Sequence, residues 1–184
     1  MKFMSSGNVV AFQRNSPTFE TMLVPTDGSA LSIAAALKAI KFAKRLKVNV
    51  LAFQSIPVYR YPVYLGGIPF EYPSEADYES QCRAIADRYL DLIANAATAQ
   101  GVAVSKLIEF NSVSAQSILE VARRENCSMI FMGSHGRSGL SSAFLGSVAL
   151  KTLTLAHIPV MVDRPTPEEI AEAEEMMSQC AIEP

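Results

Sequence analysis

The chain has 184 residues, 49% of them hydrophobic, so it can bury one core of ordinary size and is short for two full domains. Lysine and arginine total 16 against 18 acidic residues, and neither sign forms a long run, which argues against a nucleic-acid partner. Three cysteines lie far apart and no apolar stretch approaches about 20 residues, so we expect a cytoplasmic protein with reduced thiols and no membrane partner.

The N-terminal part of the chain predicts an irregular extension, a strand and a helix. Residues 1–18 show no hydrophobic period, and residues 19–25 are an apolar run of strand length. The turn-forming sequence Thr-Asp-Gly-Ser follows at residues 26–29. From Ser29 on, apolar residues recur at steps of three and four, as expected for an amphipathic helix: Ile33, Leu37, Ile40, Ala43 and Leu46.

The middle of the chain predicts two further strands with a long helix between them. Residues 48–56 and 102–110 are apolar runs of strand length. Residues 57–74 contain four prolines and two adjacent glycines, so this stretch cannot be regular throughout. Residues 75–100 carry one apolar stripe at helical spacing, and Gly101 stands where the C-cap is expected.

The last third of the chain continues the alternation of helices and strands. We predict a helix from Ser114, as its N-cap, to Glu125, and a buried strand over 129–132. A helix near 147–156, a strand over 159–162 and an acidic helix over 167–179 complete the prediction. Short apolar strands that alternate with helices indicate an α/β fold with a parallel sheet covered on both faces.

Two loops of this predicted fold suit a ligand. In open α/β sheets, ligands bind beyond the carboxyl ends of the strands where the strand order reverses. Residues 26–29 follow the first strand, and a glycine-rich segment follows the fourth. This segment, residues 132–148, reads Met-Gly-Ser-His-Gly-Arg-Ser-Gly-Leu-Ser-Ser-Ala-Phe-Leu-Gly-Ser-Val. Glycine backbone N–H groups and a helix N-terminus favour phosphate, so we expect an anionic ligand.

The spacing Gly133-x2-Gly136-x9-Gly146-Ser147 resembles the ATP-binding pattern of the universal stress proteins. The sequences of residues 23–29 and 157–162 are similar to that family's first and last strands. The resemblance implies a doubly wound, Rossmann-like α/β sheet of five parallel strands in the order 3-2-1-4-5. It covers a nucleotide-binding domain over 19–163, after which residues 164–184 form an acidic helical tail.

The resemblance also implies a stress-response or signalling module that binds ATP, or alternatively ADP or AMP, with Mg or Mn accompanying the nucleotide. It implies a homodimer that pairs through the last strand. Asp27 would hold the ribose or help the divalent ion. The other residues that it assigns to the nucleotide are Pro25, Thr26, Ala52, Phe53, Met132, Gly133, His135, Gly136, Arg137, Gly146, Ser147 and Val148.

Several alternatives stay open at the level of the sequence. Asp27 would also serve as an N-cap for the first helix, a role that Ser29 can fill as well. The family often has His-Val where this chain has Ala52-Phe53, and a phenylalanine there can stack on the base or crowd it out. A nucleotide-free dimerisation scaffold and an adenylyl-transferring enzyme remain alternatives. We expect no dedicated enzyme and at most weak ATP hydrolysis, because no general base other than Asp27 or His135 is available.

Overall fold

The computed structural model describes residues 20–60, 73–136 and 145–180. Five parallel strands form one sheet in the order β3-β2-β1-β4-β5, which confirms the predicted fold. The strands are β1 (Thr21–Pro25), β2 (Asn49–Ile56), β3 (Val104–Phe110), β4 (Met129–Gly133) and β5 (Val160–Asp163). The helices are α1 (Ala30–Leu46), α2 (Glu75–Ala99), α3 (Ser114–Arg124), α4 (Ser147–Leu155) and α5 (Pro167–Cys180).

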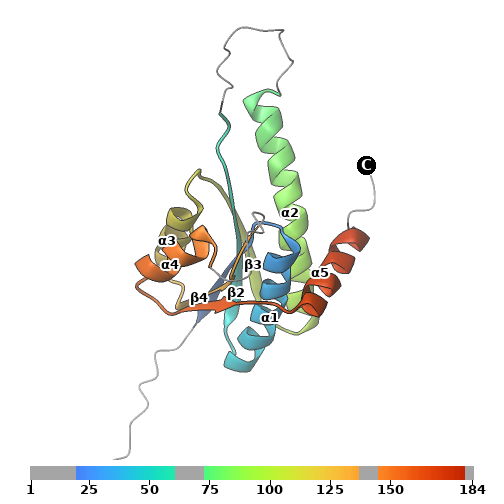
Figure 1. Ribbon diagram of the computed structural model, residues 1–184, viewed down its shortest axis with the longest axis vertical. Coiled ribbons are helices and arrows are strands. Elements are labelled where there is room, and N and C mark those ends of the chain that lie inside the picture. The colour runs from blue at the N-terminus through green and yellow to red at the C-terminus, as the bar shows by residue number, and fades with distance from the viewer. Residues whose placement is uncertain (1–19, 61–72, 137–144, 181–184) are drawn as a thin grey trace, which may run out of the picture.

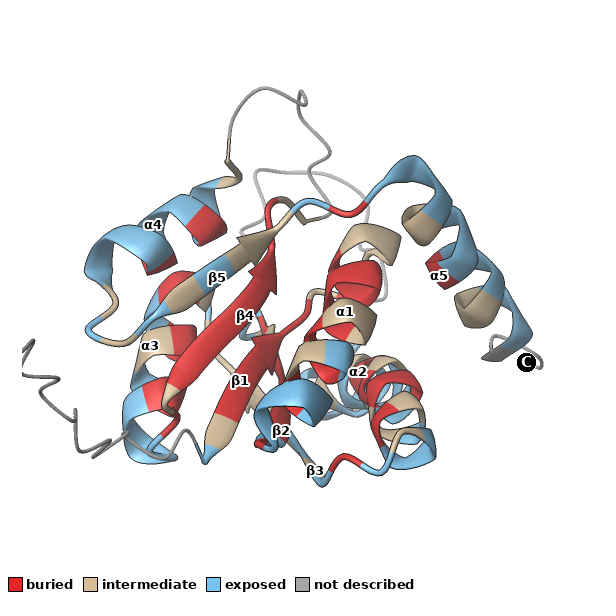
Figure 2. Ribbon diagram, turned by 90° about the horizontal axis from the view of Figure 1, so that it is seen from below, coloured by how far each residue is buried: buried red, intermediate tan, exposed pale blue. Residues whose placement is uncertain are grey.

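Helices cover both faces of the sheet, as Figure 1 shows. Alternate residues of each strand point to opposite faces, so Met22 and Val24 of β1 pack with α1 and α2, whereas Leu23 packs with α3. Two separate apolar clusters result, one on each side of the sheet. Buried residues therefore fill β4, all of β1 after its first residue, and the inner side of α1 (Figure 2). This continuous burial explains why these strands are apolar runs in the sequence.

Local signals fix the beginning of α1 and thereby the loop that precedes it. Ser29 is the N-cap, and its hydroxyl oxygen accepts a hydrogen bond from the Ser32 N–H at 3.3 Å. Gly28 has a φ of +78°, a conformation that favours glycine. A Cβ at position 28 would overlap the ring of Tyr89 on α2. The turn between β1 and α1 therefore packs closely against α2.

The helix α2 is the longest element, and its N-terminal half extends beyond the sheet (Figure 1). Ser74 caps it by accepting a hydrogen bond from the Asp77 N–H at 3.1 Å. Its C-cap is Gln100, so Gly101, the predicted cap, lies one position after the observed cap and has a φ of +72°. No helix within the described residues is long and apolar enough to cross a membrane.

The predicted capping of α3 is wrong. Val113 occupies the N-cap position, and Ser114 is the first helical residue instead. The Asn111 side-chain oxygen accepts a hydrogen bond from the Val113 N–H at 2.9 Å. This local turn places the N-cap of the helix one residue before the predicted position. The hydroxyl of Ser114 is consequently not used as a cap.

The C-terminal helix α5 packs on the face covered by α1 and α2. Ala173 is fully buried there. The helix starts with a capping box, in which Thr166 N–H donates to a Glu169 carboxylate oxygen at 2.8 Å and Glu169 N–H donates to Thr166 Oγ1 at 3.3 Å. Lys38 Nζ of α1 lies 2.8 Å from the same carboxylate, and this hydrogen bond raises the pKa of Lys38 and lowers that of Glu169. The acidic helix is thus docked on its own chain.

Candidate nucleotide site

The strand order reverses between β1 and β4, which lie side by side at the centre of the sheet. The chain leaves β1 through α1 toward β2, whereas it leaves β4 through α4 toward β5 on the opposite side. The loops that follow β1 and β4 consequently separate and leave a crevice between them. Both predicted ligand loops, residues 26–29 and the segment after Met132, begin at this point.

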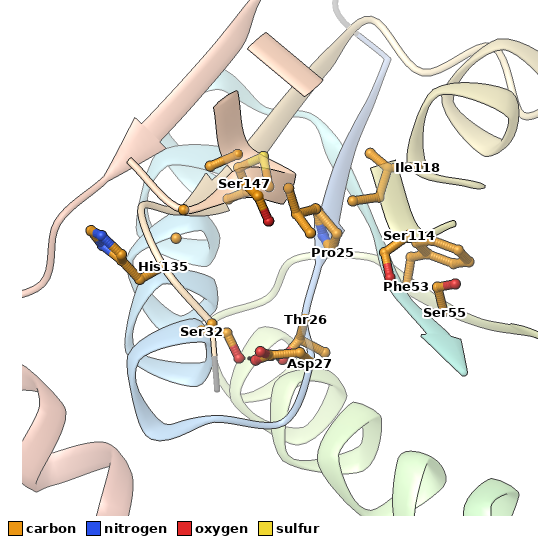
Figure 3. Close-up of a pocket in the computed structure, with 16 residues that line it drawn as sticks. Pro25, Thr26, Asp27, Ser32, Phe53, Ser55, Ser114, Ile118, His135 and Ser147 are labelled. Carbon is orange, nitrogen blue, oxygen red and sulfur yellow. Dashed lines mark hydrogen bonds between the residues drawn. The ribbon is translucent and has the colours of Figure 1, made fainter. Parts of the chain in front are cut away.

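A cavity of about 290 Å³ occupies the crevice. Figure 3 shows side chains from both halves of the sheet converging on it. Its lining includes eleven of the thirteen nucleotide-contacting residues expected from the sequence: Pro25, Thr26, Asp27, Phe53, Met132, Gly133, His135, Gly136, Gly146, Ser147 and Val148. Sequence reasoning did not assign Ser32, Ser55, Ser114, Ile118 and Ala149, which also line it.

Asp27 connects the two loops that border the cavity. Its Oδ1 accepts hydrogen bonds from the N–H and the hydroxyl of Ser29, at 3.0 and 2.7 Å. Ser29, rather than Asp27, therefore caps α1, and Asp27 orients the cap. A Cβ at position 136 would overlap Asp27 Oδ2, so only glycine lets the loop after β4 approach this carboxylate so closely. The close contact with Asp27 thus explains why glycine occupies position 136 in this chain.

The other two glycines of the pattern are also closely packed, Gly133 against a side chain of α1 and Gly146 against the backbone that follows β4. A Cβ at Gly133 would lie 2.9 Å from Leu31 Cδ2, and one at Gly146 would lie 3.2 Å from the Ser134 carbonyl oxygen. The Gly146 N–H donates to that same carbonyl at 2.8 Å, which ties the start of α4 to the end of β4. Ser134 N–H in turn donates to the Asp163 carbonyl at 2.7 Å, so β5 also holds this loop.

The N-terminus of α4 faces the cavity. Gly146 is its N-cap and has no side-chain oxygen with which to cap the first N–H groups of the helix. Ser147, Val148 and Ala149 of the first turn all line the cavity. Figure 3 shows the hydroxyl of Ser147 directed into it. Backbone donors and a partial positive charge are thereby presented together, which is an arrangement that favours a phosphate group.

The opposite wall of the cavity is apolar. It consists of Pro25, Phe53 and Met132 from three strands and Ile118 from α3. Phe53 is fully buried among the residues between the sheet and α3, and its ring forms part of the wall beside the cavity. The neighbouring residue Ala52 points to the other face of the sheet and packs with α1 and α2, so it does not line the cavity.

Hydroxyl groups stand at two edges of this apolar wall. Thr26 and Ser32 share a buried hydrogen bond of 2.7 Å beside Asp27. Ser55 lies beyond Phe53 on β2 and donates to the Asn111 carbonyl at 3.1 Å, close to Ser114 at the start of α3. Sequence reasoning missed Ser55 because the strand is buried on both faces, so its pattern does not reveal which side faces a ligand.

Of the remaining polar residues of the predicted site, the structure describes His135 but not Arg137. His135 lines the cavity, and its Nδ1 lies 3.1 Å from Ser134 Oγ. Arg137, predicted to contact phosphate, lies outside the described residues. Asp27 is the only carboxylate among the lining residues, and no group of three His, Cys, Asp or Glu side chains suited to a metal ion occurs in the described parts of the chain.

Comparison with known proteins identifies relatives of one kind. The sequence model described as the universal stress protein family matches residues 18–164. Universal stress protein MJ0531 of Methanocaldococcus jannaschii is 31% identical over 148 residues, which are 78% of this chain and 81% of that protein. Universal stress protein YxiE of Bacillus subtilis is 30% identical over 150 residues, which are 79% of this chain and 99% of that protein.

Solved structures share the fold at lower identity. UspA from Lactobacillus plantarum superimposes with a TM-score of 0.62 at 21% identity, covering 79% of this chain and 98% of that one. A universal stress protein from Archaeoglobus fulgidus in complex with dAMP has a TM-score of 0.56 at 17% identity, and the match covers 79% of this chain and 98% of that one. A universal stress protein family protein from Arabidopsis thaliana with AMP bound has a TM-score of 0.54 at 16% identity, and the match covers 82% of this chain and 94% of that one.

Proposed function

This chain belongs to the universal stress protein family, and we propose that it binds ATP, or ADP or AMP, in the cavity between β1 and β4. It would act as a nucleotide-dependent stress-response or signalling module in the cytoplasm. The observation that carries the proposal is the cavity itself, where an apolar wall faces three closely packed glycines and a helix N-terminus whose N-cap residue is glycine. Two solved structures with the same fold contain dAMP and AMP, which supports an adenine nucleotide as the ligand.

The two sides of the cavity suit the two ends of a nucleotide. The first turn of α4 and the hydroxyl of Ser147 would bind the phosphates, because they offer N–H and O–H donors and a partial positive charge. The flat base would lie against Phe53, Met132 and Ile118, which remove its faces from water. Phe53 stands in the wall, and a cavity of about 290 Å³ remains beside it, so stacking is favoured over exclusion of the base.

Asp27 lies on the side of the cavity where the ribose or a divalent ion would be bound. One of its oxygens is engaged by Ser29, which fixes the orientation of the carboxylate. Magnesium is commonly held by one or two carboxylates together with substrate phosphates, so a single Asp fits an Mg or Mn ion that arrives with the nucleotide. With Asp27 and His135 as the available acid–base groups, we propose binding as the main activity and hydrolysis as slow at most.

A paired substitution at Ser147 tests the proposal. Ser147 is exposed at the first position of α4, where a carboxylate is compatible with the helix but repels a phosphate. We predict that Ser147→Glu weakens ATP binding at least about tenfold, whereas the neutral, equally large Ser147→Gln weakens it much less. Calorimetric titration with ATP and Mg measures both affinities, and circular dichroism verifies that both variants are folded.

These two variants give a clearer test of phosphate binding than substitutions of the glycines would. A side chain at position 133 would push against Leu31, and one at 136 would displace Asp27, so loss of binding there would also follow from a distorted loop. Equal affinities of Ser147→Glu and Ser147→Gln would place the phosphates elsewhere. Absence of any binding by the unmodified protein would favour the nucleotide-free dimerisation scaffold.

We also propose a homodimer that forms through β5. This strand lies at the edge of the sheet, so one side of its backbone has no partner strand within the described chain. Exposed apolar side chains are close to it in sequence, with Leu150 and Leu153 on α4 and Met161 on the strand itself. A twofold pairing of this edge would satisfy the backbone groups and cover apolar surface.

A further inference from the structure

A second groove, of about 540 Å³, lies at the end of the sheet opposite the nucleotide site. It is formed where α3 and α4 end, next to the starts of β4 and β5. Apolar side chains provide much of its surface: Leu119, Ala122, Cys127, Leu155 and Ile158. Polar residues complete the lining: Gln116, Glu120, Arg123, Asn126 and His157. Leu155 is 58% exposed, which is an unfavourable state for a leucine beside an open apolar groove.

The first strand, β1, begins beside this groove. The Thr21 carbonyl accepts hydrogen bonds from both the N–H and the hydroxyl of Ser128, at 2.9 and 3.0 Å. Ser128 directly follows Cys127, a residue of the groove. The chain that precedes Thr21 therefore starts next to the groove wall.

That preceding segment contains a sequence suited to an apolar groove. Residues 9–12 read Val-Val-Ala-Phe and are flanked by polar residues on both sides. Phe12 is nine residues before Thr21, and about nine residues of extended chain reach roughly 30 Å. A short tether gives the segment a high effective concentration at a nearby surface, so even a few apolar contacts suffice for docking.

We propose that residues 9–12 dock in the groove between the C-terminal ends of α3 and α4. The occupant is this chain's own N-terminal segment, because its attachment point, its length and its apolar residues all match the groove. Docking covers Leu155 and Cys127, and it attaches the segment to the two helices that also border the nucleotide cavity at their other ends.

Cys127 provides a reporter for this contact within the full-length protein. Its thiol lines the groove and is the group that docking would shield further from alkylation, whereas Cys82 on α2 lies on the other face of the sheet and serves as the internal reference. Alkylation with iodoacetamide is followed at each cysteine by mass spectrometry. The test compares Phe12→Asp with Ser6→Asp, which adds the same charge at a polar position of the same segment.

We expect Phe12→Asp to raise the alkylation rate of Cys127 about tenfold relative to Cys82, and Ser6→Asp to leave it unchanged. Equal rates for Cys127 in all three proteins would overturn the proposal. Protection that depends on protein concentration would also overturn it, because the occupant would then be a second copy. ATP affinity is measured on the same samples and reports separately on the nucleotide site.

Discussion

Asp27 and Gly136 illustrate how individual residues shape the candidate nucleotide site. The carboxylate fills the space that a Cβ at position 136 would need, and it also orients Ser29 at the start of α1. One glycine thus permits contact between two loops that are more than a hundred residues apart in sequence. The requirement for glycine at this position arises from the protein's own packing in addition to any ligand.

At the same scale, the burial of Cys127 makes the stability of the fold depend on pH in the alkaline range. Burial, and secondarily the charge of Glu125, raises the pKa of the thiol from 9.0 to about 11. The folded state holds the proton more tightly, so the stabilisation is complete below pH 9 and is lost as the pH rises to about 11. We predict that the free energy of unfolding falls over this range by about 2–3 kcal/mol more in the unmodified protein than in Cys127→Ala.

Urea denaturation at several pH values measures this difference. The Cys127→Ala variant loses some stability at every pH because a buried side chain is shortened, so the slope with pH is the informative quantity. Parallel curves for the two proteins would contradict the assigned role of the thiol.

The individual contacts that the sequence could not predict are those made between elements. The glycine spacing predicted the loop after β4, because phosphate loops have a local sequence signature. Ser55 and Ser114 have no such signature, and they reach the cavity only because β2 and α3 meet there. Ala52 and Phe53 are adjacent in a strand that is buried on both faces, so only the structure shows that Phe53 faces the cavity.

At the scale of elements, α5 belongs to the packed structure although it follows the segment matched by the family model. Ala173 is fully buried against α1 and α2, whereas Ala171 on the same helix is exposed. We predict that Ala173→Arg lowers the free energy of unfolding by about 1–3 kcal/mol and raises hydrogen exchange in α5. The matched variant Ala171→Arg should change neither quantity appreciably.

Equal effects of the two substitutions in chemical denaturation and hydrogen exchange would mean that α5 does not pack as described. Periodicity in the sequence predicted the existence and the length of α5, and the acidic residues indicated its exposed side. Which surface receives its apolar side depends on α1, including Lys38, whose ion pair with Glu169 joins residues distant in sequence. Local patterns carry no information on such pairings.

At the scale of the whole molecule, the strand order followed from the family resemblance, and the same resemblance suggests pairing of two copies through β5. Met161 is 37% exposed on this edge strand, and Leu46, 47% exposed, lies at the end of α1. We predict that Met161→Arg converts a dimer into a monomer in sedimentation velocity, because two like charges would meet across the twofold axis. Leu46→Arg is the control and should remain dimeric.

A monomeric unmodified protein, or a Met161→Arg variant that stays dimeric, would exclude β5 as the interface. Within the described residues the edge position leaves one side of the strand unpaired, and in the proposed dimer the second copy would pair with it. The proposed interface is next to α4, whose first turn faces the nucleotide cavity.

The central claim, that the cavity between β1 and β4 holds an adenine nucleotide, is tested most directly by extraction. Freshly purified protein and its Ser147→Glu variant are denatured by heat, and the released nucleotides are separated by chromatography. We predict ATP, ADP or AMP in amounts comparable to the protein chain, and much less from the folded variant. No nucleotide from either protein, together with no binding of added ATP, would contradict the claim.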